Sequence, residues 1–381
     1  MVKISGFKAT RPTKSHVSKF ITKGYSYYSK KELISEQKNN PYSFLNILNN
    51  NKTNSNFNHV QENLQCFKKK GIIRQDKEDY IYIYDQIKNN ITYSGIICGI
   101  SLKEYKQKKI KIHEKTLRKR ELIFAKYLSQ AKVYAEPVLI THKSKYIHKI
   151  INENKKDKNQ LYNFIDIDNT QHIIWTTTTE IGKDIIKKFS HIDNLYIADG
   201  HHRMSSSLIN DSINQCLAYI VPYSQLTTLP FHRIIHYNST PKELLNRISK
   251  HINLKQVKTP FNNQNSAHMY LNKVWYKIQF NQDKTDLDLI NNLFIKQLSE
   301  KLLKPVFNIK DERNNKNIKF IPGDQCIEEL IKRIEQNQVL FYLPTIKINT
   351  IMEISDNNKT MPPKSTFIIP KIPSGLIMME L

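Results

Sequence analysis

The chain has 381 residues and a formal net charge of +25, with 39% hydrophobic and 10% aromatic residues. This length suffices for two domains or for one large α/β unit with an appendage, and the apolar and aromatic content excludes global disorder. No apolar run approaches the ~20 residues of a membrane span, the N-terminus has no apolar signal region, and the four cysteines form no C-x-x-C pair. We therefore expect a folded cytoplasmic protein that lies in a reducing compartment and does not bind membranes.

The positive charge raises the possibility of nucleic-acid binding, because Lys and Arg contacts to phosphates supply most non-specific affinity. The basic residues are spread from Lys3 to Lys371, however, and the chain is also rich in Ile, Asn, Lys and Tyr. An A+T-rich genome produces this combination. We favour that bias over nucleic-acid binding as the source of the charge. If the chain does bind nucleic acid, the dense basic clusters at 66–74 and 103–120 are the candidate contact segments.

In the first half of the chain, the hydrophobic pattern predicts strands that alternate with helices. The clearest element is a hairpin, in which two runs of strong β-formers flank a Lys-Asn-Asn turn at 88–90. Polar loops are expected at 49–58 and 152–160. The predicted elements are a strand over 2–7, helices over 29–37 and 60–71, strands over 80–87 and 93–101, charged helical structure within 102–131, strands over 135–143 and 171–179, and a helix over 180–190.

The second half continues the pattern and contains a composition shift near Asn238. Before this shift the sequence predicts a strand over 195–198, a turn, a helix, and strands over 217–223 and 231–237. Beyond it the predicted elements are helices over 241–252, 286–303 and 326–336, with strands over 274–280 and 339–345. We therefore predict an α+β fold with one domain over 1–236 and a smaller mixed α/β domain over 237–381.

The stretch "NLYIADGHHRMSSSLIN", residues 194–210, predicts a strand, a tight turn at Asp199-Gly200 and a helix. Two imidazoles and a guanidinium then fall in the first helical turn, where unpaired N–H groups and the helix dipole favour anions. The same residues also fit a structural interpretation, with Asp199 as an N-cap, Gly200 as a turn residue and a solvated basic turn. Cations at that helix end oppose the dipole, which favours an anionic ligand.

Other chemistries can be weighed against this anion site. Neither Gly-rich phosphate-binding motif occurs, so any nucleotide must be held by side chains and helix ends. The run "IHEKTLR" lacks the second histidine of a zinc protease, and His232 and His236 lie on a predicted strand, too far apart for one metal. Glu114 is a carboxylate in a basic segment, which is also compatible with a simple helical ion pair to Arg118.

The C-terminal run "PPKSTFIIPK" has a structural and a functional interpretation. It is either an edge strand with a basic face or a second phosphate-contacting segment. In the second case the last strand returns lysines toward the site.

Four strings carry a resemblance to a known family: "IKIHEKT", "YIADGHHRM", "LPFHRII" and "MPPKSTFIIPKIPSGL", in that order over nearly the whole chain. They resemble the bacterial and archaeal family called domain of unknown function 1015. The signature is also similar to the ParB and sulfiredoxin superfamily, whose members bind nucleotides or phosphates at a strand-turn-helix. The most similar motif is the Asp-Gly-His-His-Arg of free serine kinases. Where sulfiredoxins carry their nucleophilic cysteine, this chain has His201, so we expect no sulfiredoxin chemistry.

The resemblance implies phosphoryl transfer on a small metabolite, with free L-serine or O-phosphoserine as substrate, ADP or ATP as nucleotide and Mg²⁺ as cofactor. It implies catalytic roles for Glu114, Asp199 and His202, with Asp199 also near the metal and Glu32 a rival to Glu114 as the base. It implies phosphate contacts from Gly200, His201, Arg203, Lys364, Ser365, Thr366 and Lys371.

The chain departs from many family members near its N-terminus. They carry a Pro-Pro-Tyr-Asp run, where this chain has "KGYSYYS" at 23–29. Two other functions stay open: a non-catalytic nucleotide- or nucleic-acid-binding regulatory protein, and a phosphatase acting on a small metabolite.

Overall fold

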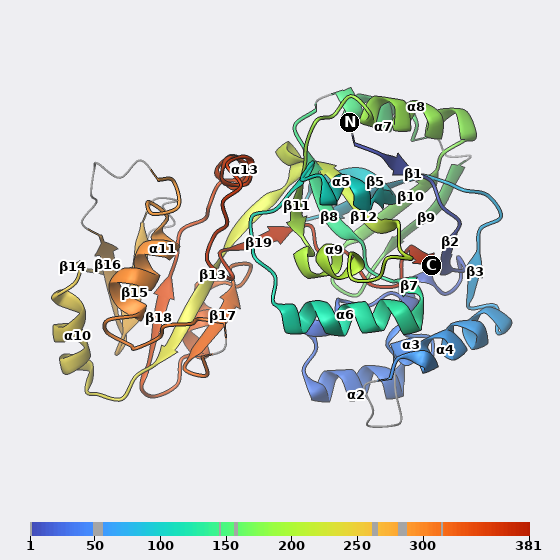
Figure 1. Cartoon of the computed structure of the whole chain (residues 1–381). Coiled ribbons are helices and arrows are strands. Elements are labelled where there is room, and N and C mark those ends of the chain that lie inside the picture. The colour runs from blue at the N-terminus through green and yellow to red at the C-terminus, as the bar shows by residue number, and fades with distance from the viewer. Residues whose placement is uncertain are drawn as a thin grey trace. The chain divides into compact units, whose positions relative to one another are not determined.

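The computed structural model describes residues 2–48, 56–144, 146–155, 159–260, 266–280, 288–313 and 315–381 (Figure 1). Parts of three expected segments lie outside these residues, namely 49–55 and 156–158 of the polar loops and 286–287 of a predicted helix. The chain forms two compact units. The first unit comprises Met1–Ile112, Thr116–Leu226 and Pro370–Leu381, and the second comprises His113–Lys115 and Thr227–Ile369.

Mixed strands form the main sheet of the first unit. Within the described residues this sheet has nine strands, and β11 runs parallel to β6 but antiparallel to β8. In spatial order the strands are β6 (Ile110–Lys111), β11 (Leu195–Asp199), β8 (Val138–His142), β12 (Gln215–Pro222), β5 (Ile91–Ser101), β4 (Tyr82–Lys88), β10 (Gln171–Thr176) and β9 (Gln160–Ile165), with β1 (Ile4–Ser5) also paired to β5.

Helices cover both faces of this sheet (Figure 1). Helices α7 and α8 lie on one side, and α9 and α6 lie on the other. The helical segments of the first unit are α1 (Val17–Phe20), η1 (Tyr25–Tyr27), α2 (Lys30–Asn39), α3 (Leu45–Leu48), α4 (Asn58–Lys69), α5 (Leu102–Lys106), α6 (Arg118–Ala131), α7 (Tyr146–Glu153), α8 (Thr179–Phe189), α9 (His201–Ser207) and η3 (Tyr223–Gln225).

A smaller sheet ties the end of the chain into the first unit. Its strand order among the described residues is β3 (Ile73–Gln75), β2 (Ala9–Pro12), β20 (Met378–Glu380) and β7 (Val133–Tyr134). Helix α4 buries Val60, Leu64 and Phe67, one face of an amphipathic helix, in the core beneath this sheet. The last residues of the chain are therefore part of the first unit's core.

The second unit is built on an antiparallel sheet. In the described residues its order is β14 (Asn253–Val257), β16 (Val274–Gln279), β15 (Ala267–Leu271), β18 (Gln338–Tyr342), β13 (Thr227–His236) and β17 (Ile318–Pro322), and β19 (Thr366–Ile369) pairs with the first half of β13. Its helical segments are α10 (Pro241–Ser249), α11 (Phe294–Leu298), the π-helix η4 (Ser299–Leu303), α12 (Ile327–Lys332) and α13 (Ile348–Asp356).

The structure confirms an α+β fold and several local predictions. The predicted hairpin exists as β4 and β5, and Asn89 and Asn90 take φ values of +50° and +61°, which suit a two-residue loop of the type favoured between twisted strands. Helix α10 starts with a capping box between Thr240 and Glu243. The predicted domain division, 1–236 and 237–381, differs from the compact units in three places, because β13 and His113–Lys115 belong to the second unit and residues 370–381 belong to the first.

Two segments predicted to be helical contain other structure as well. The segment 102–131 is interrupted where Lys108 adopts a φ of +59° and Ile110–Lys111 pairs with β11, so two helices flank a short strand. In the segment predicted over 286–303, the α-helix begins only at Phe294 and continues as a π-helix from Ser299. Among the described residues, no helix combines the length and the apolar character that crossing a membrane requires.

Candidate functional site

The strand-turn-helix predicted at residues 195–207 is confirmed. Strand β11 ends at Asp199, Gly200 is the N-cap with a φ of +94°, and α9 begins at His201. A Cβ at position 200 would lie 2.8 Å from both Nε and Nη2 of Arg203. Glycine is required here for the left-handed backbone and for the space that the guanidinium of Arg203 fills.

An ion pair joins this turn to the C-terminal segment. Asp199 Oδ1 accepts from the Gly200 N–H at 2.9 Å, and Oδ2 accepts from Lys371 Nζ at 2.8 Å. Burial alone would lower the pKa of Lys371, but the Asp199 carboxylate and Tyr27 reverse this effect and the pKa is raised. The side chains of Asp199 and Lys371 are 40% and 28% exposed, so a ligand in solution can reach the pair.

Arg203 makes a second ion pair beside the first. Its Nη1 donates to Glu136 Oε1, and Ser374 Oγ donates to Glu136 Oε2 at 3.2 Å. Burial lowers the pKa of Arg203 to about 10, so the guanidinium stays charged at neutral pH. Its Nε is buried and has no hydrogen-bond partner among the described residues. Sequence reasoning did not find Glu136, whose only local signal is its position just before β8.

His202 is held at the start of α6. Its Nε2 accepts the backbone N–H of Leu117, the N-cap residue of α6, at 3.0 Å. An accepting Nε2 carries no proton, so the ring is neutral and its proton lies on Nδ1. The next residues of α6, Arg118, Lys119 and Arg120, are exposed. Their charges therefore lie beside His202 and strengthen the positive potential there.

The N-terminal segment 23–29 also reaches this site. The hydroxyl of Tyr27 hydrogen-bonds to Lys371, and burial raises the pKa of this tyrosine. Glu32, considered above as a base, closes the capping box of α2 by accepting the Ser29 N–H at 2.6 Å. That bond and the Ser29 hydroxyl lower the pKa of Glu32, which weakens it as a base.

Glu114 belongs to the second unit. It forms an isolated parallel bridge with Met361, whose N–H donates to the His113 carbonyl at 2.9 Å. Asp199 and His202, the other two residues predicted to be catalytic, lie in the first unit, as do Gly200, His201, Arg203 and Lys371. The catalytic role of Glu114 stays a prediction.

The other predicted phosphate contacts, Lys364, Ser365 and Thr366, are also in the second unit. The Lys364 ammonium lies 4.8 Å from the ring centroid of Phe231, and Ser365 Oγ donates to the Pro362 carbonyl at 2.6 Å. Thr366 is the first residue of β19. These contacts hold the Pro-Pro-Lys-Ser-Thr turn in place, and its contact with phosphate stays a prediction.

A buried arginine that sequence reasoning missed anchors the same turn. Arg233 donates to the Phe231 carbonyl at 2.6 Å and to the carbonyls of Pro363 and Lys364 at 3.2 Å, and it pairs with Glu312. Burial lowers its pKa to about 10. The "FHRII" string thus places an arginine whose contacts shape the turn that carries Lys364.

The site in the first unit consists of two cations, two carboxylates and a neutral imidazole around one glycine turn. Oxygen ligands from carboxylates are those that Mg²⁺ prefers. Both oxygens of Asp199 already accept hydrogen bonds, so this residue suits a metal held through water rather than by direct coordination. The ammonium and guanidinium suit the oxygens of a phosphate or carboxylate.

A family model described as "Protein of unknown function (DUF1015)" matches residues 4–302. The chain belongs to the DUF1015 family. No curated protein matches this DUF1015 chain.

Several solved structures are similar in fold to this DUF1015 protein. A free serine kinase in complex with AMP is 13% identical, with 75% of this chain and 91% of the kinase covered at a TM-score of 0.41. SbnI with a C-terminal truncation, from Staphylococcus aureus, is 10% identical, with coverages of 72% and 82% and a TM-score of 0.41. A conserved hypothetical protein from Pyrococcus furiosus is 12% identical, with coverages of 75% and 94% and a TM-score of 0.41. Because these TM-scores are below 0.5, they say nothing about the activity of this chain.

Proposed function

We propose that the protein transfers a phosphoryl group to or from a small metabolite, with free L-serine and O-phosphoserine as substrates and ADP or ATP as the nucleotide. The observation that carries the proposal is the assembly of Lys371, Arg203, His202 and Asp199 around Gly200 in the first unit. Asp199, His202 and Arg203 belong to one Asp-Gly-His-His-Arg motif, and Lys371 joins them from the C-terminal segment. The motif resembles that of free serine kinases.

The side chains divide the work of phosphoryl transfer, which depends mainly on positioning and charge neutralisation. Lys371 and Arg203 bind phosphate oxygens. When the anion binds, each cation replaces some of its contact with its carboxylate partner by contact with the phosphate. The neutral His202 donates from Nδ1 to a phosphate oxygen. In the direction of phosphoserine synthesis, the serine hydroxyl attacks the terminal phosphorus of the nucleotide, the bond to the bridging oxygen breaks, and a carboxylate base takes the hydroxyl proton. Glu114 is the candidate for this base from the sequence alone.

Asp199 would help to hold a Mg²⁺ ion, which would supply further neutralisation of the phosphate charge. The exposed first turn of α6, with Arg118, Lys119 and Arg120, raises the local concentration of anionic substrates. These charges are continuous with the site, since Leu117 contacts His202. This position favours a small phosphorylated ligand over a separate nucleic-acid surface.

The test is to incubate the protein with O-phospho-L-serine and Mg²⁺, with and without AMP or ADP, and to follow phosphoserine by phosphorus NMR. We expect phosphoserine loss only with nucleotide, and equal formation of ADP or ATP. His202→Ala should abolish turnover. His191→Ala, which removes an exposed histidine from the same unit, should leave it unchanged.

Other outcomes contradict the proposal in different ways. Release of inorganic phosphate without nucleotide indicates a phosphatase at the same anion site. No turnover in either direction, with serine and ATP or ADP as the reverse mixture, indicates a binding module. A salt-dependent titration of random DNA then tests the nucleic-acid alternative.

A further inference from the structure

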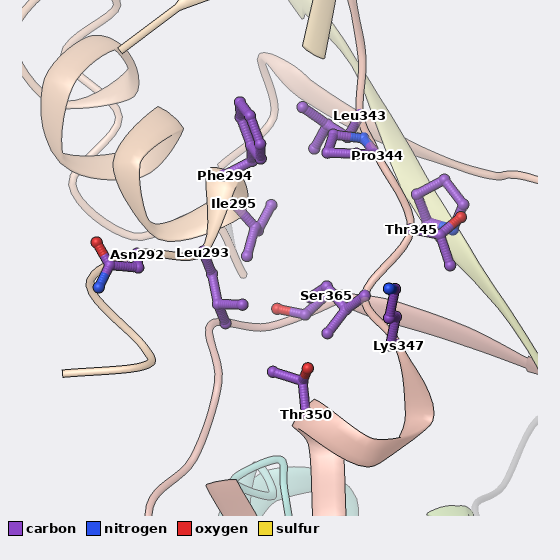
Figure 2. A pocket seen from close by; sticks show the side chains of 12 residues that line it. Asn292, Leu293, Phe294, Ile295, Leu343, Pro344, Thr345, Lys347, Thr350 and Ser365 are labelled. Atoms are coloured by element: carbon purple, nitrogen blue, oxygen red, sulfur yellow. The ribbon is translucent and has the colours of Figure 1, made fainter. Parts of the chain in front are cut away.

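The second unit contains a cavity of about 190 Å³ that the proposed phosphoryl-transfer site does not use. It is open to the surface and lined by the start of α11, the segment that follows β18, the first turn of α13 and Ser365 (Figure 2). In Figure 2, Leu293, Phe294 and Ile295 lie opposite Thr345 and Lys347. All of these residues belong to one compact unit, so the cavity is a property of that unit alone.

Apolar groups line both sides of the cavity. Leu293, Phe294 and Ile295 contribute hydrocarbon surface from the start of α11, and Leu343 and Pro344 contribute it from the segment that follows β18 (Figure 2). An apolar cavity of about 150 Å³ is large enough to bind benzene. A cavity of about 190 Å³ therefore accepts a ring or a branched chain with a small polar group attached.

The side opposite α11 also carries polar groups and positive charge. Lys347 is the N-cap residue of α13, an exposed cation whose side chain lines the cavity. Thr345 and Thr350 add hydroxyl groups to the lining. The first turn of α13 contains no acidic residue, so its backbone N–H groups reinforce the charge of Lys347 rather than offset it.

We propose that this cavity binds a small carboxylic acid whose apolar part is a ring or a compact branched chain of about six to nine non-hydrogen atoms. The apolar part lies against Leu293, Phe294 and Leu343, and the carboxylate lies at Lys347 and the first turn of α13. The proposal does not depend on the phosphoryl-transfer site. The size of the cavity and the positive charge of Lys347 select the ligand.

The experiment uses benzoate as the probe and benzyl alcohol as its neutral counterpart, with ligand-observed saturation-transfer NMR on the full chain. We expect both to bind, with benzoate the tighter by about fivefold at low salt, because the charged group gains about 1 kcal/mol at this helix end. Raising the salt concentration should remove the advantage of benzoate and leave benzyl alcohol unchanged.

Two substitutions separate the charge from the cavity. Lys347→Met should weaken benzoate about fivefold and leave benzyl alcohol within twofold, while Lys332→Met, an exposed lysine elsewhere in the unit, should change neither. Thr350→Phe, which fills the cavity, should abolish binding of both without changing the circular dichroism spectrum. The proposal is overturned if neither probe binds at millimolar concentration, if benzylammonium binds as well as benzoate, or if Thr350→Phe leaves binding intact.

Discussion

Gly200→Ala should destabilise the first unit by about 3 kcal/mol. An alanine in the left-handed conformation costs about 1–2 kcal/mol. Its Cβ would also lie 2.8 Å from Nε and Nη2 of Arg203, so the guanidinium must move and weaken its bond to Glu136. Losing a charged hydrogen bond in a partly buried site costs about 1.5 kcal/mol more.

The measurement is urea unfolding followed by tryptophan fluorescence. The chain has two tryptophans, Trp175 in β10 of the first unit and Trp275 in β16 of the second. In a Trp275→Phe background, Trp175 reports the unfolding of the first unit alone, which avoids treating two units as one transition.

Gly71→Ala is the matched control, because Gly71 has a φ of +70° with nothing within 4 Å of its Cβ position. This substitution should lower the free energy of unfolding by about 1 kcal/mol, because it adds backbone strain and no steric clash. In an Arg203→Ala background, the cost of Gly200→Ala should fall to the same value. Equal costs for both glycines in the presence of Arg203 would refute the argument that Gly200 makes room for its guanidinium.

Three further predictions concern charged groups. Burial, and secondarily the charge of Arg233, lowers the pKa of His232 to about 3 in the folded chain. In the unfolded chain the pKa of a histidine is about 6.5, so below this pH the unfolded chain binds a proton that the folded chain does not. The free energy of unfolding of the second unit should therefore fall by roughly 2 kcal/mol between pH 6.5 and pH 5, as measured by Trp275 fluorescence. His232→Gln should remove this pH dependence, and an equal pH dependence in the variant and the unmodified protein would refute the prediction. Arg233→Met leaves the buried Glu312 without its cation and should destabilise the second unit by about 3–5 kcal/mol in the same assay, with part recovered by adding Glu312→Gln. Lys371→Met should cost less than about 1 kcal/mol of stability but weaken inorganic phosphate binding at least tenfold, measured by phosphorus NMR line broadening, and unchanged phosphate binding contradicts its role.

The sequence predicts well those features that neighbouring residues determine. The Asn-Asn turn of the β4–β5 hairpin and the strand-turn-helix at Gly200 follow from backbone preferences and hydrophobic period within about ten residues. The partner of Arg203 could not be predicted in this way. Glu136 comes just before β8, and only the antiparallel pairing of β8 with β11, in which Leu139 faces Asp199, brings it beside α9.

Burial explains the remaining differences. Arginines usually lie at the surface, so the sequence did not indicate that Arg233 of "FHRII" is buried. Its side chain is fully buried because three carbonyls and Glu312 accept its hydrogen bonds. Lys371 donates to Asp199 in the first unit, and Lys364 lies over Phe231 in the second unit. Two lysines seven residues apart therefore belong to different units because the chain crosses from one to the other after Ile369.

This crossing sets the order in which the protein is completed during synthesis. The ribosome makes every residue of Thr227–Ile369 before it reaches Pro370–Leu381, so the second unit can fold while the first still lacks β20, Lys371 and Ser374. Until those last residues emerge, the bonds from Lys371 to Asp199 and from Ser374 to Glu136 cannot form. A product that terminates after Ile369 keeps the described strands of the second unit's sheet, but it leaves the nascent first unit with an open sheet edge for chaperones to protect.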